Sequence, residues 1–346
     1  MTSDVPKVAF YVPSPELVQD VPSRVSDYWS WIHDAIKLMP GRLPSGELYY
    51  WSGAYNWTVQ TFMYLREHGF PCELTSSIPH EGIVVAHSKW WPVFLRPSPR
   101  QFFVEIKPDK FLQCIFTNVV VVQNRRDPLH EGWRRFLITS AVVNNWPQPG
   151  LIPRDPRRGT RFENVCFMGY AAEFIKDVDD LAHAVRSLGV NWEIRPKETW
   201  HDYRDVDAVV AVRPAESVMF NRKPATRLTN AWLAHVPAVL SPDIAFEDIR
   251  TSELDYLRAR NVGEIVGALK TLIASPDLRM LMMDHARTRA EEFTYERNVG
   301  NWIDAFEKQI IPAYRRWQRS PLYRMGFTSS RLLAHKTVGV DPYIGD

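Results

Sequence analysis

The segment from residue 223 to residue 240 constrains the fold more than any other part of the chain. Pro224 suits the first turn of a helix, where its missing N–H is no loss. Apolar residues then recur at helical spacing, namely Ala225, Leu228, Ala231 and Trp232. Pro237 ends this helix, and the apolar run Val236–Leu240 predicts a short buried strand. A helix that leads directly into a buried strand is typical of layered α/β proteins.

The same alternation of strand and helix patterns fills the first 145 residues. Strands are predicted at Lys7–Val12, Leu48–Trp51, Cys72–Thr75, Ile83–His87, Phe102–Ile106 and Asn118–Val122. Helices are predicted at Ser23–Leu38 and Trp57–His68, with a loop at Ser52–Asn56 before the second helix. The continuous valines of Asn118–Val122 are typical of a parallel strand that is covered on both faces.

A proline- and arginine-rich stretch, residues 144–160, interrupts the alternation and predicts a stiff, extended linker. The alternation then resumes. Strands are predicted at Asn164–Met168, Trp192–Arg195, Ala208–Arg213 and Val236–Leu240, and helices at Asp177–Leu188, Val262–Ala274, Pro276–Glu292 and Asn298–Arg319. Two α/β halves joined by one linker would form a cleft that grips a ligand from both sides.

Composition and charge exclude several classes of protein. With 45% hydrophobic and 24% charged residues, the chain of 346 residues is an ordinary soluble globule, and its net charge of +2 is too small for a nucleic-acid binder. No apolar run approaches the roughly 20 residues of a membrane span, and the N-terminus lacks the apolar region of a secretory signal. The three cysteines (Cys72, Cys114 and Cys166) lack metal-ligand spacing, which indicates reduced core thiols in a cytoplasmic protein.

The charge is uneven near the C-terminus. No acidic residue lies between Glu307 and Asp341, whereas seven lysines and arginines do, with Trp317, Tyr323 and Phe327 among them. One interpretation is a patch for peripheral contact with an anionic membrane, at its inner face. The alternative is a solvated helical face whose aromatic residues pack on the body of the protein.

The start of the helix in the 223–240 segment predicts an anion site. Lys223 and Arg227 would lie one turn apart on the same side, beside the exposed N–H groups at the positive end of the helix dipole. Thr226 adds a hydroxyl or backbone N–H in the first turn. A phosphate or diphosphate is the anion that best fits such a place. The alternative for Lys223 and Arg227 is an exposed cation pair beside carboxylates such as Glu216.

With these patterns established, the second half resembles the donor domain of glycosyltransferases of the GT-B fold. The signature of those enzymes runs through a helix, a proline and an apolar strand in forms such as E-A-x-A-x-G-x-P-V-V, and residues 230–239 match its outline. Asn230 stands where many retaining members carry Glu, and His235 stands where Gly is usual. Residues 148–155 are similar to the interdomain linker of some bacterial transferases, and Gly169 follows the first strand of the donor domain.

The resemblance implies an α/β fold with two Rossmann-like domains separated by a cleft, and a C-terminal helix that crosses back to the first domain. Residues 1–145 would be the acceptor-side domain and residues 146–161 the linker. Residues 162–297 would be the nucleotide-sugar donor domain, and residues 298–346 a helix and basic tail on the first domain. Nucleotide-sugar ligands would be Lys223, Thr226, Arg227, Asn230, Arg213, Arg154 and Gly169.

The predicted chemistry needs no bound cofactor and no metal, with the nucleotide-sugar as co-substrate. Asp205 and Asp207 have D-x-D spacing but lead straight into an apolar strand, where they more simply cap a loop. Fixed cations and a helix N-terminus would instead stabilise the leaving diphosphate. An inverting reaction also needs a base, for which His87 at the end of its strand is the candidate. Retention of configuration would remove that role.

The sequence therefore predicts a glycosyltransferase of the hexosyltransferase type in glycan biosynthesis. Its acceptor would be a glycan, a lipid-linked precursor or a small molecule. Two alternatives stay open. One is a sugar-nucleotide epimerase on the same double fold, and the other is a non-catalytic GT-B-like subunit that binds glycan or a partner transferase. Asn230 and His235, as departures from the signature, keep the non-catalytic alternative open.

Overall fold

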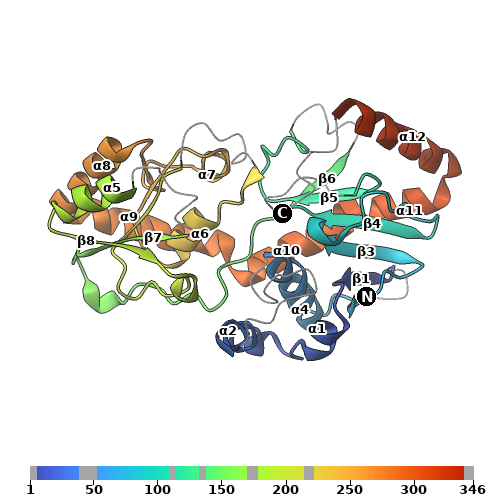
Figure 1. Ribbon diagram of the computed structural model, residues 1–346, viewed down its shortest axis with the longest axis horizontal. Helices are drawn as coiled ribbons and strands as arrows, with labels where there is room; N and C mark the ends of the chain where they lie inside the picture. The colour runs from blue at the N-terminus through green and yellow to red at the C-terminus, as the bar shows by residue number, and fades with distance from the viewer. Residues whose placement is uncertain are drawn as a thin grey trace. The chain divides into compact units, whose positions relative to one another are not determined.

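The computed structural model describes residues 6–38, 53–108, 114–131, 138–169, 178–213 and 222–338. The chain packs as two compact units. The first unit comprises Met1–Asn145, Arg222–Pro224 and Asn298–Asp346, and the second comprises Trp146–Asn221 and Ala225–Arg297. Each unit is built on one parallel sheet (Figure 1). The predicted fold class, α/β with two parallel-sheet domains, is confirmed.

The sheet of the first unit has the strand order β2-β1-β3-β4-β5-β6. Its strands are β1 (Val8–Tyr11), β2 (Cys72–Thr75), β3 (Gly82–His87), β4 (Gln101–Ile106), β5 (Val119–Val122) and β6 (Thr139–Val142). All neighbours in this sheet run parallel. Each residue of β3 and β5 is buried, as the continuous apolar runs predict for strands covered on both faces.

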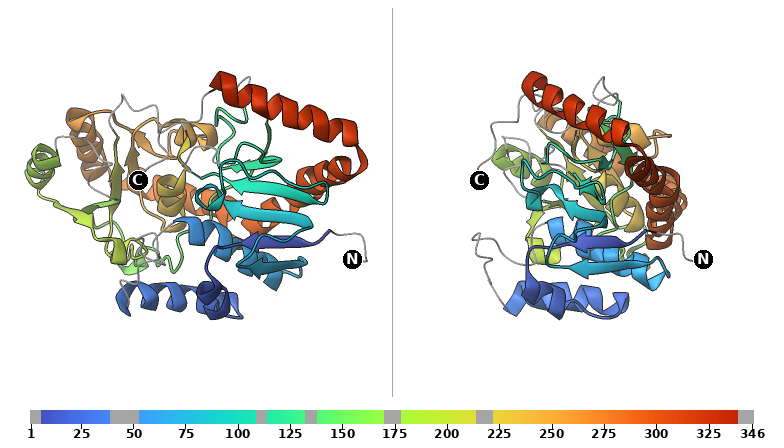
Figure 2. Two further views of the ribbon diagram at one scale, coloured as in Figure 1. Left: turned by 45° about the vertical axis from the view of Figure 1, so that its right-hand side comes forward. Right: turned by 90° about the vertical axis from the view of Figure 1, so that its right-hand side faces the viewer.

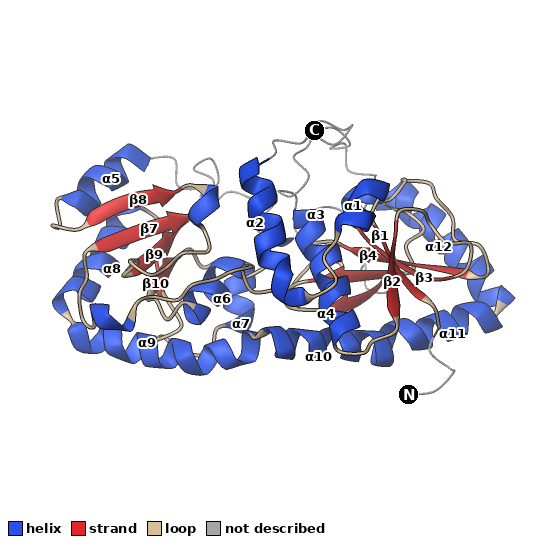
Figure 3. Ribbon diagram, turned by 90° about the horizontal axis from the view of Figure 1, so that it is seen from below, coloured by secondary structure: helices blue, strands red, loops and turns tan. Residues whose placement is uncertain are grey.

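Helices from both ends of the chain contribute to the first unit (Figure 3). The N-terminal ones are α1 (Pro15–Asp20), α2 (Tyr28–Leu38), α3 (Gly53–Tyr55) and α4 (Thr61–Glu67), and the C-terminal ones are α10 (Tyr295–Ala305), α11 (Ile311–Arg319) and α12 (Pro321–Val338). On one face Phe62 of α4 packs against Phe10 of β1, and Tyr314 of α11 packs against Phe102 of β4. The other face carries a cluster around Phe103, against which Phe327 of α12 packs.

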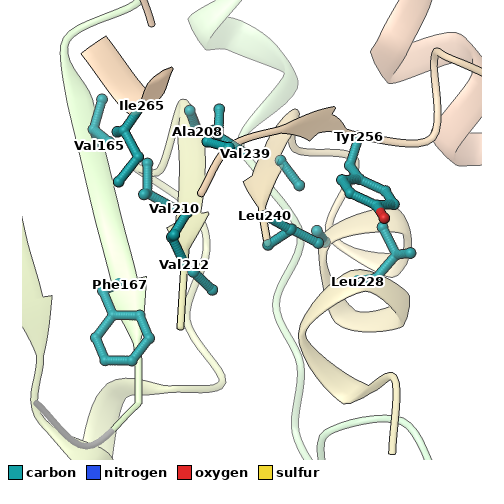
Figure 4. Packing of buried hydrophobic residues seen from close by; sticks show 14 of the residues in the cluster. Val165, Phe167, Ala208, Val210, Val212, Leu228, Val239, Leu240, Tyr256 and Ile265 are labelled. Atoms are coloured by element: carbon teal, nitrogen blue, oxygen red, sulfur yellow. The ribbon is translucent and has the colours of Figure 1, made fainter. Parts of the chain in front are cut away.

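The sheet of the second unit has the order β11-β10-β9-β7-β8, again parallel. Its elements are β7 (Asn164–Met168), α5 (Val178–Arg186), β8 (Asn191–Arg195), β9 (Ala208–Ala211), α6 (Thr226–Leu233), β10 (Ala238–Leu240), α7 (Ile244–Ile249), β11 (Leu257–Arg258), α8 (Val262–Ala274) and α9 (Pro276–Ala290). One hydrophobic cluster joins the strands to the helices, with Ile265 of α8 and Leu228 of α6 among its members (Figure 4).

Several elements differ from the sequence predictions. The chain is helical from Gly53 through Glu67, including a π-helical turn at Asn56–Gln60, so the described part of the predicted loop Ser52–Asn56 is helix. Strands β6 and β11 and helices α1, α7 and α12 were not predicted. The predicted strand Leu48–Trp51 lies outside the described residues. No helix within the described ranges is both long and apolar enough to cross a membrane.

The proline-rich stretch after residue 145 is part of the second unit rather than an extended spacer. The backbone N–H of Ile152 donates to the carbonyl of His201 at 2.8 Å, and that of Arg154 donates to the carbonyl of Ala234 at 3.0 Å. Asp155 caps a short 3₁₀ turn at Pro156–Arg158 through its side chain. Prolines fix the backbone of this stretch, but its hydrogen bonds to the unit decide where it lies.

Candidate functional site

The strand order of the second unit identifies one edge of its sheet as the place for a ligand. From β7 the chain moves outward to β8 and then returns to place β9 on the other side of β7. In open α/β sheets such a reversal leaves room for ligands outside the carboxyl ends of the two strands. Gly169 directly follows β7, and Arg213 lies two residues beyond the end of β9. Both residues therefore lie at the carboxyl ends of their strands.

Arg227 lies against Gly169 at this edge. Its guanidinium carbon is 4.9 Å from the ring centroid of Phe167, the last residue but one of β7. A β-carbon added to Gly169 would be 2.6 Å from Nη2 of Arg227 and 2.6 Å from Cζ of Phe167. Glycine at position 169 is therefore what allows the arginine to reach the strand end. The sequence alone did not identify Phe167 as part of the site. The signal was its position two residues before Gly169.

Arg227 is the second residue of α6 and therefore belongs to its first turn. The helix begins at Thr226, and the residue before it, Ala225, offers no side-chain cap. The carbonyl of Ala225 accepts from the N–H groups of Leu228 and Thr229, both at 3.0 Å. An anion close to Arg227 would therefore lie at a helix N-terminus that has no side-chain cap, where the helix dipole is positive.

Lys223 lies outside this helix, so the predicted spacing of one helical turn between Lys223 and Arg227 is wrong. Lys223 precedes the first residue of α6 by three positions and packs with the first unit. Its carbonyl accepts from Nδ2 of Asn124 at 3.3 Å. The helix begins later than predicted because Ala225 already departs from helical geometry, with ψ of 23°.

Arg213 is buried at the ligand edge and paired with a carboxylate. Its guanidinium forms an ion pair with Asp243, and its backbone N–H donates to Oγ of Ser241 at 3.2 Å. Ser241 in turn donates to Asp243 at 2.6 Å. Ser241 follows β10, so these three residues connect the ends of two neighbouring strands. Both side chains of this pair are buried, so it is not a surface salt bridge.

Arg154 lies at the opposite edge of the sheet and is not placed to bind a ligand with Gly169. Its Nε and Nη2 donate to Asp207 at 3.1 and 2.8 Å. Asp207 directly precedes β9 and also accepts from the backbone N–H groups of Glu163 and Asn164, where β7 begins. These are the amino ends of the strands, so Arg154 and Asp207 fasten the chain there. The contact predicted for Arg154 with a nucleotide-sugar is corrected accordingly.

Asn230 is buried and fastened to the chain that precedes β7. Its Oδ1 accepts from the backbone N–H of Gln148 at 3.2 Å, and the carbonyl of Gln148 accepts from the Tyr295 hydroxyl at 3.3 Å. The predicted contact of Asn230 with a nucleotide-sugar therefore gives way to a structural hydrogen bond. Sequence spacing does not reveal this partner, which lies 82 residues earlier in the chain.

His87 lies at the corresponding reversal of the first sheet. Strand β3 pairs with β1, which also pairs with β2, so the carboxyl ends of β1 and β3 mark the place for a ligand in this unit. His87 ends β3, is buried, and accepts from the backbone N–H of Lys89 through Nδ1 at 3.1 Å. A neutral ring in this arrangement carries its proton on Nε2.

A buried ion pair that was not predicted lies at this edge. Lys107 directly follows β4 and lies 2.7 Å from Asp127, and both side chains are almost completely enclosed. Burial lowers the pKa of Lys107, and the Asp127 carboxylate opposes that shift. The signal was a lysine immediately after an apolar strand and an aspartate shortly after the next strand.

Among the described residues, no group of three or more histidine, cysteine or acidic side chains could hold a metal ion.

Comparisons with known proteins place the fold. No family model and no curated protein matches the sequence. Sucrose-phosphate synthase from Thermosynechococcus elongatus has a TM-score of 0.51 and 10% identity, with 88% of this chain and 99% of that chain aligned. Anabaena HepE in complex with UDP-glucose has a TM-score of 0.50 and 12% identity, over 88% of this chain and 100% of that chain.

Other matches are to longer chains. Accessory secretory protein 1,2 and 3 of Streptococcus pneumoniae aligns with a TM-score of 0.42 and 9% identity, over 67% of this chain and 54% of that chain. The present chain therefore spans about half the length of that protein. At these identities the similarity shows the fold, which is that of the GT-B glycosyltransferases.

Proposed function

We propose that this chain is a glycosyltransferase that takes its sugar from a nucleotide-sugar donor and binds the donor diphosphate at Arg227. The observation that carries the proposal is the position of the Arg227 guanidinium, on Phe167 and against Gly169, beside the start of α6. The binding of UDP-glucose by HepE, which has the same fold, supports a nucleotide-sugar as the ligand.

These residues stabilise the charge that develops during the transfer. The bond between the anomeric carbon and the diphosphate oxygen breaks, and the electron pair leaves with the nucleoside diphosphate. Arg227 stabilises that negative charge together with the backbone N–H groups in the first turn of α6, including that of Thr226. Because a fixed arginine and helix dipole supply this stabilisation, the reaction does not depend on a metal ion.

The acceptor hydroxyl forms the new bond to the anomeric carbon and loses its proton. If the reaction inverts the configuration, His87 is our candidate for the base, since it ends β3 at the reversal of the first sheet. Its Nδ1 already accepts a hydrogen bond from Lys89. To accept the acceptor's proton through Nε2, the neutral ring would first have to exchange tautomers, moving its own proton to Nδ1 and giving up the hydrogen bond from Lys89.

Isothermal titration calorimetry with nucleotides tests the donor site. We expect one member of a panel of UDP-, GDP-, ADP-, CMP- and dTDP-sugars to bind the wild-type protein. The Arg227→Gln variant should bind that ligand at least tenfold more weakly, because a charge-assisted contact to phosphate is lost. Arg227→Lys should retain part of the affinity. Chromatographic detection of released nucleoside diphosphate with candidate acceptors then tests transfer.

Arg186→Gln is the matched control. Arg186 is exposed at the end of α5, close to the amino end of β8 and hence away from the ligand edge. Its substitution should leave the affinity unchanged. Absence of binding across the whole panel would favour the non-catalytic alternative. Equal affinity of the wild-type and Arg227→Gln proteins would contradict the assignment of Arg227.

A further inference from the structure

Helix α12 exposes a stripe of aliphatic side chains on its outer face. Leu322, Met325 and Leu332 are 80%, 68% and 38% exposed. At 100° per residue these three positions fall within an arc of about 80° on the helix, with Ser329 between them. Large exposed aliphatic residues on one face of a helix indicate a surface for binding.

The opposite face of α12 fastens the helix to the first unit. Arg331 is buried, donates through Nη2 to the carbonyl of Thr117 at 2.8 Å, and lies 4.9 Å from the ring centroid of Phe327. Phe327 packs edge-on against Trp317 of α11, with centroids 5.1 Å apart. Helix α12 runs along the outside of this unit in both views of Figure 2. The fold therefore holds the helix without using the outer stripe.

Positive charge surrounds the beginning of this stripe. Arg315, Arg316 and Arg319 are exposed in the last two turns of α11, and α12 begins two residues after Arg319. Arg316 also lies over the ring of Tyr323, 4.4 Å from its centroid. Arg324 turns inward instead, donating to the carbonyl of Trp317 at 2.6 Å. Along the sequence, no acidic residue lies between Glu307 and Asp341.

We propose that α12 and the end of α11 bind the surface of an anionic lipid bilayer. Leu322 and Met325 insert between the lipids, while Arg315, Arg316 and Arg319 contact the headgroup phosphates. The aromatic residues of α12, which would be the usual anchors of a protein interface, are Tyr323 and Phe327, and both pack against the protein. An exposed aliphatic stripe beside arginines matches a bilayer better than a protein partner. This proposal does not depend on the proposed function.

Vesicle flotation with the full chain tests the proposal. We expect the protein to float with vesicles of phosphatidylcholine containing about one third phosphatidylglycerol, and to stay unbound with phosphatidylcholine alone. Binding should fall at least fivefold when sodium chloride is raised from 0.1 to 0.5 M, because salt screens the attraction of the exposed arginines to the headgroups.

Two variants separate the apolar and charged contributions. Leu322→Gln/Met325→Gln and Arg315→Gln/Arg316→Gln/Arg319→Gln should each reduce binding to the anionic vesicles at least fivefold. The matched control is Met280→Gln/Leu281→Gln, which removes aliphatic residues that are 51% and 56% exposed on α9 of the second unit. That variant should bind like the wild type. Circular dichroism should show unchanged folding, and Leu322→Gln alone replaces the double variant if the latter unfolds.

The proposal is overturned by binding that is equal on neutral and anionic vesicles, by the absence of binding to both, or by an equal loss in the α9 control. A soluble anionic polymer such as heparin provides the remaining comparison. If the protein binds heparin but not the anionic vesicles, the arginines recognise a polyanion and the bilayer assignment is wrong.

Discussion

At the residue scale, Gly169 decides whether the candidate donor site exists. It lies at the end of β7, and its lack of a side chain leaves space for the guanidinium of Arg227. A β-carbon at position 169 would also clash with the ring of Phe167, which packs in the core of the second unit. The residue is therefore required by a close approach of two side chains.

We predict that Gly169→Ala weakens nucleotide binding at least tenfold while the protein stays folded. The new β-carbon would meet Nη2 of Arg227 and Cζ of Phe167, each at 2.6 Å, and the flexible arginine side chain gives way more easily than the buried ring. Titration calorimetry measures the change. Gly267→Ala on α8 is the control, since nothing lies within 4 Å of its added β-carbon. Unchanged affinity in Gly169→Ala would contradict the site.

His235 ends α6 in a conformation that favours glycine. Its φ is 57°, and among the described residues it is the non-glycine residue with a positive φ. The N–H of Val236 donates to the carbonyl of Ala231 at 2.9 Å, and the N–H of His235 donates to that of Trp232 at 3.0 Å. This is the Schellman arrangement at a helix C-terminus, whose left-handed position is usually glycine.

The left-handed conformation costs an L-residue about 1–2 kcal/mol, which glycine avoids. Because glycine also increases the conformational entropy of the unfolded chain, His235→Gly should raise the free energy of unfolding by only about 1 kcal/mol. Urea denaturation at pH 8 measures the gain. His235→Ala, which keeps the β-carbon, should show no comparable gain at that pH. A similar gain in both variants would assign the effect to the imidazole rather than to the backbone.

The same residue predicts a dependence on pH. Burial, and then the charge of Arg287, lower the pKa of His235 below its ordinary value of 6.5. The unfolded chain therefore binds a proton more readily than the folded chain. As pH falls below about 6.5, this residue destabilises the wild-type protein. Lowering the pH from 8 to 5.5 should therefore destabilise the wild-type protein more than it destabilises His235→Ala or His235→Gly.

At the scale of elements, one carboxylate fastens the chain that enters the second unit to its sheet. Asp207 accepts from Arg154, from Nε and Nη2 of Arg158 at 2.9 and 2.7 Å, and from two backbone N–H groups at the start of β7. Burial by itself would raise the pKa of Asp207, but these hydrogen bonds outweigh it and lower that pKa. The second aspartate of the D-x-D spacing is thus structural.

Asp207→Asn should lower the free energy of unfolding by about 3–5 kcal/mol, because it leaves the buried Arg154 without its carboxylate. Asp205→Asn is the control, since Asp205 is half exposed and pairs with Arg195 near the surface, so about 0–1 kcal/mol is expected. Urea denaturation at pH 7 compares the two. Because the folded-state pKa of Asp207 is lowered, its contribution is present above about pH 4 and is lost as pH falls below that value. Equal costs in the two variants would contradict the fastening role.

At the scale of the whole molecule, the chain ends in the unit where it begins. Residues from Asn298 onward belong to the first unit, and their aromatic side chains complete its core. Phe306 is fully buried, with its ring centroid 4.7 Å from that of Phe70, which follows α4. A core closed by residues more than 200 positions apart forms only after both units have been synthesised.

Phe306→Ala should destabilise the first unit by about 3–5 kcal/mol, the usual cost of removing a buried aromatic ring. Hydrogen exchange measured by mass spectrometry should then show lost protection in β1 and β3, with β7 and β9 unchanged. Phe293→Ala is the matched variant, because Phe293 packs against Trp232 in the second unit, with centroids 5.4 Å apart. It should reverse the pattern. Equal loss in both sheets from either variant would contradict two separate cores.

The sequence by itself determined the local structure and part of the site. Apolar runs and helical spacing predicted strands β1 to β5 and β7 to β10, and the helix–proline–strand segment predicted α6 and β10. These predictions succeed because the spacing of buried residues follows directly from the geometry of a strand or helix. Placing Gly169 and Arg213 at strand ends needed only the rule that ligands bind at the carboxyl edge of a parallel sheet.

Tertiary structure alone decided which cations face that edge. Arg154 lies at the amino edge because it pairs there with Asp207, which is 53 residues away in the sequence. Arg213 pairs with Asp243, 30 residues away. Asn230 is held by Gln148, 82 residues earlier. A buried polar group must find a partner wherever the fold provides one, and no local period encodes that partner. The sequence thus determined the elements, and long-range pairing determined that Arg227 is the arginine packed against Gly169.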